Sequence, residues 1–309
     1  MKHIKWKVKK WNGKDAAISF TFDDGDISQA TDVLNLLNER GIKGTFFLIG
    51  NQIQYLDEWK EALRKGHEIG NHSLSHLTPD KWIDASEISE ICGAQVKLSE
   101  AFNTDVLSFA YPYTFVTDDM VEILEKTHLS ARAGISETTY MKVTDDPMWY
   151  KLPSQIAFSY LRFQDYKKWM DETFKNEAWT ILQFHALEGT DNGYQPIRKD
   201  LFARILDYAN QENVWVAPFG KISAYWRAQK EIEKANVKES ENEIIIDWEV
   251  PAVLPGNTYV LMELEAIFNE KFVVKQGDSI ILPNHENSYK ILFSEGKLTI
   301  QCGGNENGK

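Results

Sequence analysis

Short apolar runs alternate with longer amphipathic stretches over the first two thirds of the chain. Runs rich in β-branched and aromatic residues predict buried strands at residues 16–22, 44–50, 66–71, 106–110, 129–134, 179–185 and 214–219. Apolar positions three or four residues apart predict helices at residues 27–40, 57–65, 86–102, 117–126, 164–176, 198–212 and 220–235. Strands that alternate with helices indicate an α/β architecture.

The pattern changes near residue 236. A charged segment at residues 234–243 gives way to short β-rich runs that Pro, Gly and Asn separate. This spacing predicts a small antiparallel β module resembling a sandwich. We therefore expect two domains, residues 1–236 and residues 237–309, with a disordered tail from residue 303.

Two adjacent carboxylates, Asp23 and Asp24, end the first predicted strand. Neighbouring side chains at a strand end point in different directions, so one could bind a metal while the other accepts a proton from an attacking water. His72 and His76 have a spacing that brings two rings to one side of a helical turn and suits one zinc-like ion. With Asp24 they make a two-His, one-carboxylate set that leaves positions open for water and substrate.

These residues carry a resemblance to a family. Residues 21–25 (TFDDG) and 72–76 (HSLSH) resemble the first two motifs of the polysaccharide deacetylases of the NodB homology type, carbohydrate esterase family 4. The resemblance covers about residues 10–228. Softer matches lie at residues 110–113 (AYPY) and 182–185 (LQFH).

The resemblance implies a hydrolase that removes acetyl groups from an acetylated oligo- or polysaccharide, with N-acetyl favoured over O-acetyl. It also implies a divalent metal, with zinc first and cobalt or nickel as alternatives. The roles that it implies are Asp23 as general base, Asp24, His72 and His76 as metal ligands, His185 as general acid, and the backbone N–H of Tyr113, after Pro112, as an oxyanion donor.

The resemblance further implies a distorted (β/α)7 barrel. The residues themselves agree, because the carboxylates, His72, His76, Tyr113 and His185 all fall at or just after the carboxyl ends of predicted strands, where barrel enzymes place their chemistry. A doubly wound open sheet is the alternative fold.

The main departure from the family is Ala110, where an Arg usually pairs with the catalytic Asp. Arg132 follows the next apolar stretch and could supply that charge from another strand end, which places it with Pro112 and Tyr113 among the expected substrate-side residues. An exposed surface Arg is the alternative. Asp145, Asp146 and Trp149 lie where the family's fourth motif is expected, but they are not assigned to it.

Composition excludes several functions. The net charge of −12 disfavours nucleic acids and anionic membranes, which require clustered Lys and Arg. Ten Trp and twelve Tyr suit a protein that stacks on sugar rings. The candidates for such stacking are Trp11, Trp59, Trp82, Trp149, Trp248 and Tyr259. Cys92 and Cys302 are too few for a disulfide framework.

No run in the sequence is long enough for a membrane span, and residues 1–7 lack the apolar region of a signal peptide. The family resemblance nevertheless favours a location outside the cytoplasm. The oligomeric state stays open. Two other functions remain: hydrolysis of a small amide or imide at the same site, and carbohydrate binding without catalysis.

Overall fold

The computed structural model describes residues 4–81, 86–134, 140–189, 193–266, 271–285 and 287–302. It divides into two compact units: a larger unit, Asp15–Ser223, and a smaller unit, Met1–Lys14 together with Ala224–Lys309. The division falls inside helix α7, and the first residues belong with the C-terminal strands. This differs from the expected division at residue 236, because pairing of an N-terminal strand with a C-terminal one cannot be read from local pattern.

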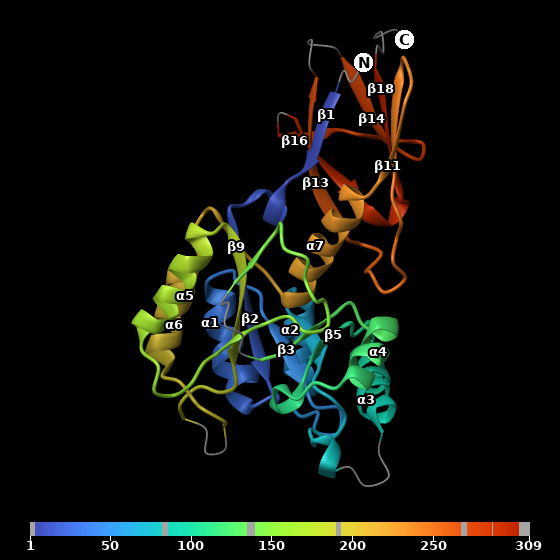
Figure 1. The fold of residues 1–309 in the computed structure, drawn as a ribbon. Helices are drawn as coiled ribbons and strands as arrows, with labels where there is room; N and C mark the ends of the chain where they lie inside the picture. The colour runs from blue at the N-terminus through green and yellow to red at the C-terminus, as the bar shows by residue number, and fades with distance from the viewer. Residues whose placement is uncertain are drawn as a thin grey trace. The chain divides into compact units, whose positions relative to one another are not determined.

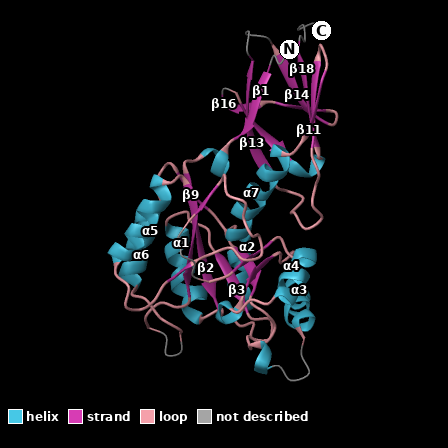
Figure 2. Ribbon diagram, in the orientation of Figure 1, coloured by secondary structure: helices cyan, strands magenta, loops and turns pink. Residues whose placement is uncertain are grey.

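A mixed α/β fold with a curled sheet forms the larger unit (Figures 1 and 2). Its main path runs β6-β5-β4-β3-β2-β9-β7, and β10 and β8 pair with β2 and β9. The strands are β2 Ala16–Asp23, β3 Thr45–Leu48, β4 Glu68–Asn71, β5 Ser108–Ala110, β6 Ser130–Arg132, β7 Met141–Lys142, β8 Gln155–Ile156, β9 Ala178–Phe184 and β10 Val214–Val216. All of these pairings are parallel except β7 with β9.

The sheet curls back on itself between β6 and β9. Arg132 on β6 forms a parallel bridge with Leu152, and β8 lies three residues farther along and pairs with β9. Consecutive pairings therefore lead from β2 through β3, β4, β5, β6 and the segment ending in β8 to β9, which pairs with β2. This path returns to its starting strand, unlike the path through an open sheet.

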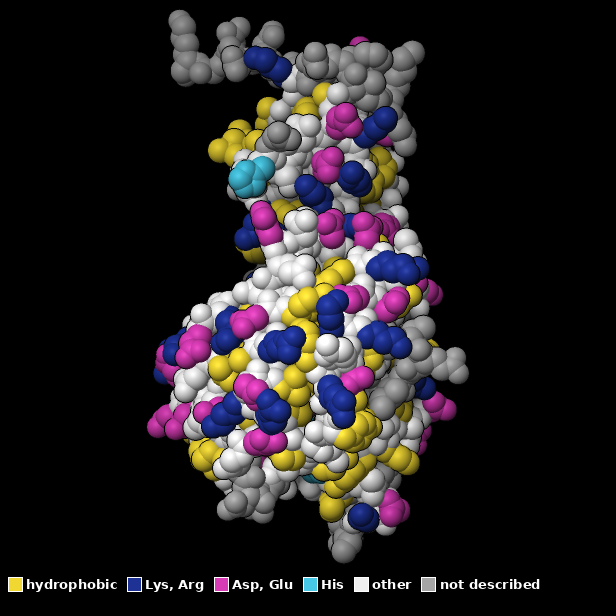
Figure 3. All heavy atoms as spheres, turned by 90° about the vertical axis from the view of Figure 1, so that its left-hand side faces the viewer, with side chains coloured by type: hydrophobic (Ala, Val, Ile, Leu, Met, Phe, Trp, Pro, Cys, Tyr) yellow, Lys and Arg dark blue, Asp and Glu magenta, His cyan; other side chains and the backbone are white. Residues whose placement is uncertain are grey.

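Helices cover the outer face of this sheet. They are α1 Leu34–Glu39, α2 Leu56–Arg64, α3 Glu87–Phe102, α4 Asp118–Thr127, α5 Phe163–Lys175, α6 Lys199–Ala209 and the start of α7 Phe219–Glu233. A π-helical turn, Gln29–Val33, precedes α1. Helices α5 and α6 lie side by side, as do α3 and α4 (Figure 1). The face drawn in Figure 3 carries Lys, Arg, Asp and Glu side chains mixed together.

Alternation along the strands sorts side chains between the two faces. On β2, Phe20 and Phe22 pack in the core formed with the helices, so Thr21 and Asp23 point to the opposite, inner face. On β9, Phe184 lies in the same core, which places Gln183 on the inner face. The inner face of the sheet therefore carries polar groups although both strands are buried throughout.

Two antiparallel sheets make up the smaller unit. One has the order β1-β13-β17-β16 and the other β11-β12-β18-β14-β15. The strands are β1 Ile4–Val8, β11 Asn236–Glu239, β12 Glu243–Asp247, β13 Tyr259–Ala266, β14 Phe272–Gln276, β15 Ser279–Ile281, β16 Pro283–His285, β17 Ser288–Leu292 and β18 Lys297–Cys302. Buried and more exposed residues alternate along β12 and β13, so each of these strands presents one apolar face.

Most predicted elements occur within a few residues of their expected bounds. Thr117 caps α4, because its side chain accepts a hydrogen bond from the N–H of Met120. The short strands β1, β7, β8, β11 and β16 were not predicted. The tail from residue 303 lies outside the described residues. Among described residues, no helix is long and apolar enough to cross a membrane.

Candidate functional site

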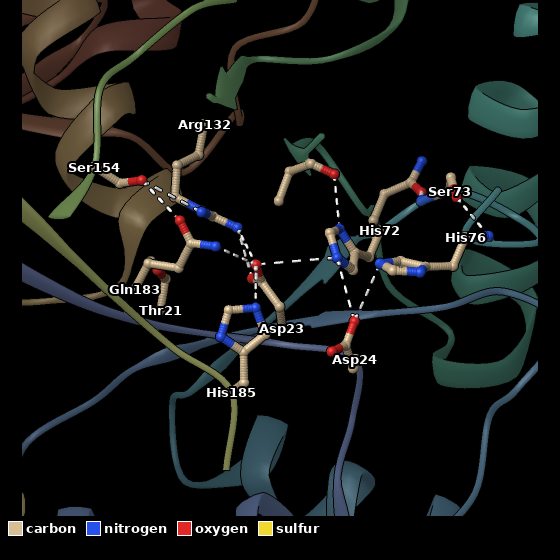
Figure 4. Close-up of polar contacts among 12 residues, drawn as sticks. Thr21, Asp23, Asp24, His72, Ser73, His76, Arg132, Ser154, Gln183 and His185 are labelled. Carbon is tan, nitrogen blue, oxygen red and sulfur yellow. Dashed lines mark hydrogen bonds and ion pairs between the residues drawn. The ribbon is translucent and has the colours of Figure 1, made fainter. Parts of the chain in front are cut away.

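Strand β2 delivers two carboxylates to the carboxyl edge of the sheet. Asp23 is its last residue and is 1% exposed. Asp24 follows in the left-handed conformation, with φ 77°, and Gly25 has φ 76°. A left-handed Asp costs free energy that an ordinary turn residue avoids, and such strain is common at functional sites. The two carboxylates share His72 as a neighbour, but Asp24 also lies against His76 and Asp23 against Arg132 (Figure 4).

His72 and His76 come from the loop that follows β4. This loop is not helical, in contrast to the expected helical turn: Ser73 and His76 have φ 65° and 57°. Asn71 and Ser73 hold the loop, because Asn71 Oδ1 accepts the N–H of Ser73 and Ser73 Oγ accepts the N–H of His76. The two rings nevertheless converge, with centroids 4.8 Å apart. Local hydrogen bonds within residues 71–76, rather than helical geometry, thus accompany the juxtaposition that the spacing suggested.

Three side-chain atoms converge in a manner that fits a divalent metal. Asp24 Oδ1 lies 3.5 Å from His72 Nε2 and 3.3 Å from His76 Nε2, and one ligand atom from each residue lies within 4.8 Å of the others. Two ligands each about 2.1 Å from one tetrahedral ion are roughly 3.4 Å apart. Asp24 Oδ1 is buried and, among described residues, has no hydrogen-bond partner. A cation would satisfy this oxygen.

The tautomer of His72 also fits a metal ligand. Its Nδ1 lies 2.8 Å from the carbonyl oxygen of Ala110, which can only accept, so Nδ1 carries the proton and Nε2 presents its lone pair toward Asp24. Metal-binding histidines commonly donate their second N–H to a carbonyl in this way. The residues of the cluster therefore fit the metal that the sequence predicted.

Asp23 lies beside this cluster in a buried polar network (Figure 4). Arg132 Nη2 lies 2.6 Å from both oxygens of Asp23, and Gln183 Nε2 donates to Asp23 Oδ2 at 2.9 Å. Ser154 Oγ lies 2.9 Å from Gln183 Oε1 and 3.4 Å from Arg132 Nη1. Each of these side chains is at most 4% exposed. The network fixes the orientation of the Asp23 carboxylate.

Arg132 occupies the inner face next to Ala110. The two residues are register partners on the parallel strands β5 and β6. The guanidinium therefore comes from the strand beside that of Ala110, where the sequence resemblance led us to expect an Arg, and at the same level of the sheet. Since Arg132 is 1% exposed and lies against Asp23, it contacts the carboxylate rather than a substrate. Its alternative interpretation as an exposed surface Arg is wrong.

His185 follows β9 on the other side of Asp23. Its Nε2 lies 3.8 Å from Asp23 Oδ2, and its ring packs 4.7 Å from that of Tyr194. The 3₁₀ turn Pro112–Thr114 begins two residues after β5 and holds Tyr113 at φ 54°. The Tyr113 ring packs 4.6 Å from that of His76. In the described part of the chain no acceptor pairs with the Tyr113 N–H.

Burial and charge set the pKa values of these groups. Burial alone would raise the pKa of Asp24, but the His72 ring, with His185 and His76, lowers it to about 2. Burial lowers the pKa of His76 to about 4 and also lowers that of His185. For His72, burial acts to lower the pKa, but Asp23 and Asp24 raise it. An ionised Asp24 and a neutral His76 are the forms that coordinate a cation.

A pocket of about 450 Å³ adjoins the cluster. Asp24 and His185 line this pocket, together with the aromatic residues Tyr55 and Tyr194. Gln52 and Gln54 are among the other lining residues, so the pocket offers amide donors and acceptors together with ring faces. This combination suits a polar ligand with flat apolar surfaces, such as a sugar.

Sequence reasoning missed Gln183, Ser154 and Tyr194. A signal for Gln183 existed, because it lies two residues before His185 in a strand and therefore shares its face. The contacts of Ser154 and Tyr194 depend on tertiary structure, so local pattern could not have found them.

Several predicted residues do not reach the site. Trp11 is fully buried and packs against Trp226, and Trp59 is 1% exposed and packs against Phe46. Neither can stack on a sugar. Trp149 packs beside a satellite core, and Asp145 accepts a hydrogen bond in an exposed turn. Trp82 lies outside the described residues.

Comparison with known proteins identifies relatives of this chain. The sequence profile of the polysaccharide deacetylase family matches residues 10–131. The peptidoglycan-N-acetylglucosamine deacetylase of Bacillus cereus is 33% identical over 120 residues, 38% of this chain and 54% of that protein. The chitin disaccharide deacetylase of Vibrio alginolyticus is 41% identical over 69 residues, 19% of this chain and 16% of that protein.

Among solved structures, that of a putative polysaccharide deacetylase from Mycobacterium smegmatis covers 72% of this chain and 94% of its own, with a TM-score of 0.59 and 18% identity. This likeness supports the fold. The chain spans about half or less of the length of the curated relatives described above.

Proposed function

Because residues 10–131 match the polysaccharide deacetylase family, we propose that this protein is a metal-dependent hydrolase that removes acetyl groups from an acetylated carbohydrate. The observation that carries the proposal is the cluster of Asp24, His72 and His76 with Asp23 beside it. Asp23 Oδ2 lies 3.9 Å from His72 Nε2, so a second carboxylate is at hand that need not bind the metal.

In this proposal Asp24, His72 and His76 hold the metal. A divalent cation at this position would polarise an acyl oxygen and lower the pKa of a water molecule. Zinc suits the two-His, one-carboxylate set best, with cobalt or nickel as alternatives.

Asp23 acts as the general base. Arg132 and Gln183 hold its carboxylate from one side, which leaves the carboxylate aimed at a water that attacks the acetyl carbon. A fixed carboxylate needs no reorganisation at the moment of proton transfer. The Tyr113 N–H supplies a donor for the developing oxyanion, and Pro112 fixes the turn that presents it.

His185 acts as the general acid. It lies on the pocket side of Asp23 and lines the pocket with Tyr194. Because burial lowers its pKa, its protonated form is a stronger acid than an exposed imidazolium and gives its proton readily to a leaving amine or alkoxide. Tyr55 and Tyr194 would pack against the sugar that carries the acetyl group.

The expected substrate is an N-acetylated glycan. The two relatives described above are named for N-acetylglucosamine in peptidoglycan and for a chitin disaccharide, which favours N-acetyl over O-acetyl. Such polymers lie outside the cytoplasm, which is where we propose that the enzyme acts. The closed path of strand pairings supports a distorted seven-stranded barrel, and the alternation of buried residues in the smaller unit supports a sandwich.

Acetate release tests this function. Chelator-stripped protein, with and without zinc or cobalt, is given N-acetylglucosamine oligomers and acetylated xylan. We expect metal-dependent acetate release, with oligomers of N-acetylglucosamine preferred. Asp23→Asn should retain the metal and lose nearly all turnover, at least ~10²-fold, because the base is removed. Asp105→Asn changes an exposed carboxylate of the same unit and should keep full activity.

Two results would contradict the proposal. Substantial acetate release by Asp23→Asn would remove Asp23 from the role of base. Absence of acetate from every substrate, with metal bound, would reject the deacetylase, and rapid hydrolysis of a short soluble amide would then favour the small-amide hydrolase.

A further inference from the structure

A second concave surface lies in the smaller unit, and none of its lining residues belongs to the proposed mechanism. It is a groove of about 520 Å³ bordered by the edge strands of the two sheets, β1 and β11, and by β13. Its volume falls in the range of small-molecule sites, roughly 300–1,000 Å³. The groove forms because residues near the N-terminus join the C-terminal strands as β1.

Apolar side chains contribute to the lining of this groove. Trp6 on β1 is partly exposed and pairs in register with Leu264, which is fully buried. Val237 on β11 is 37% exposed although its register partner Ile246 is fully buried. Trp6 and Val237 therefore lie on the inward faces of their sheets, at edges that the other sheet does not cover. The Trp6 indole offers a broad apolar face and one N–H donor to a ligand.

Charges of both signs line the rim of this groove, on the face of β1 and β13 opposite Trp6. Lys5 and Lys7 on β1 pair in register with Glu265 and Glu263 on β13, and Lys7 Nζ lies 3.4 Å from Glu263. A polyanion would meet the carboxylates, and a polycation would meet the ammonium groups. A neutral ligand with many hydroxyl groups can accept from the lysines and donate to the glutamates, since each hydroxyl does both.

The same residues disfavour a protein strand as the occupant. Edge strands that add another strand are long, flat and apolar, whereas Lys on an edge discourages pairing. Strand β1 carries Lys5 and Lys7, and β11 carries Lys238 and Glu239. Both borders of the groove are thus protected against strand addition.

We propose that this groove binds a neutral polysaccharide chain, with a sugar ring against Trp6 and hydroxyl groups bonded to the flanking Lys and Glu side chains. The choice of a polysaccharide rests on the proposed deacetylase function, because the smaller unit itself supplies no catalytic group of the mechanism. Binding at this groove keeps the polymer attached to the protein. This attachment raises the rate of deacetylation of long chains but not of short ones.

The test measures retention of the full chain on insoluble polymers. Protein carrying Asp23→Asn, which leaves the polymer unchanged, is sedimented with chitin, peptidoglycan and acetylated xylan. Adding Trp6→Ala should weaken retention on at least one polymer by about tenfold. Ile280→Ala is the control, because this Ile is 60% exposed on β15 and does not line the groove. It should leave retention unchanged.

A second pair of substitutions separates binding from folding. If Trp6→Ala lowers the unfolding temperature, Lys5→Ala with Glu265→Ala replaces two exposed side chains at the groove and should weaken retention without changing that temperature. In otherwise unaltered protein, Trp6→Ala should slow acetate release from polymer and not from a short oligomer.

Equal retention of all groove variants and the parent would overturn the proposal. A dimer that light scattering detects in the parent and not in Trp6→Ala would also overturn it, with a second copy as the occupant. The proposed function can fail separately, since Trp6-dependent retention without acetate release from any substrate rejects the enzyme and keeps the groove.

Discussion

At the scale of single residues, the site depends on one buried oxygen with two imidazoles beside it. Asp24 Oδ1 has no hydrogen-bond donor among the described residues, and such an atom costs about 1–3 kcal/mol when it stays unsatisfied. The left-handed conformation of Asp24 adds to this cost. A cation bound by His72, His76 and Asp24 would offset both of these costs. Metal binding would then relieve the strain in the side chains that hold the metal.

Metal binding should therefore stabilise the fold measurably. Zinc at about 100 times its dissociation constant adds about 2.7 kcal/mol to the free energy of unfolding. We expect zinc to raise the unfolding temperature of the stripped protein, and His76→Ala to lose most of this rise because one of three ligands is gone. His285→Ala, which replaces an exposed His of the smaller unit, should keep it. The same rise in His76→Ala as in the parent would exclude His76 as a ligand.

At the scale of elements, the register of two parallel strands explains the arginine. Ala110 and Arg132 are partners on β5 and β6, and partners on neighbouring parallel strands present side chains to the same face. A guanidinium from either position can therefore reach the inner face near Asp23. This register explains how Arg132 supplies a cation to Asp23 although residue 110 is Ala.

An exchange of the two residues tests this explanation. Arg132→Ala should lower the free energy of unfolding by about 3–5 kcal/mol and reduce turnover, because it leaves the buried Asp23 carboxylate without its cation. Combining it with Ala110→Arg should recover part of both losses. Arg40→Ala is the control. The ion pair of Arg40 with Asp207 is exposed, so this substitution should lower the free energy of unfolding by less than about 1 kcal/mol. A double variant no better than Arg132→Ala would refute the register argument.

At the scale of the whole molecule, buried histidines outside the metal cluster couple stability to pH. Burial lowers the pKa of His67 to about 4 and that of His128 to about 3. The contacts of His128 agree, because its Nε2 lies 3.2 Å from the amide nitrogen of Asn71, which can only donate. Nε2 must therefore accept, and a proton there would break the contact.

The sign of the pH effect follows from these values. Between about pH 6.5 and 4 the unfolded chain binds protons at both histidines and the folded chain does not, so stability falls as pH falls through this window. Urea unfolding measured at pH 7 and at pH 5 should show that the free energy of unfolding is lower at pH 5, by on the order of 2 kcal/mol for each His. His128→Gln keeps an acceptor for Asn71 and should flatten the dependence. An unchanged slope in that variant would contradict the assignment to His128.

The sequence by itself indicated the candidate site residues of this protein and the order of its elements. Asp23, Asp24, His72, His76 and His185 stand next to apolar runs, and the carboxyl ends of parallel strands meet at one edge, so strand prediction alone placed them together. The cap of α4 can likewise be read from local sequence, because Thr117 accepts the N–H of Met120, three residues later.

Only the tertiary structure decided which side chains support that chemistry. Arg132 and Gln183 contact Asp23 although they follow it in the sequence by 109 and 160 positions. Strand β1 pairs with β13, which lies far along the chain from it. Local pattern reports which face of an element is apolar, but not which distant element covers it. The arginine beside Asp23 and the groove beside Trp6 both arise from such distant pairings, because burial and register act on neighbours in space rather than in sequence.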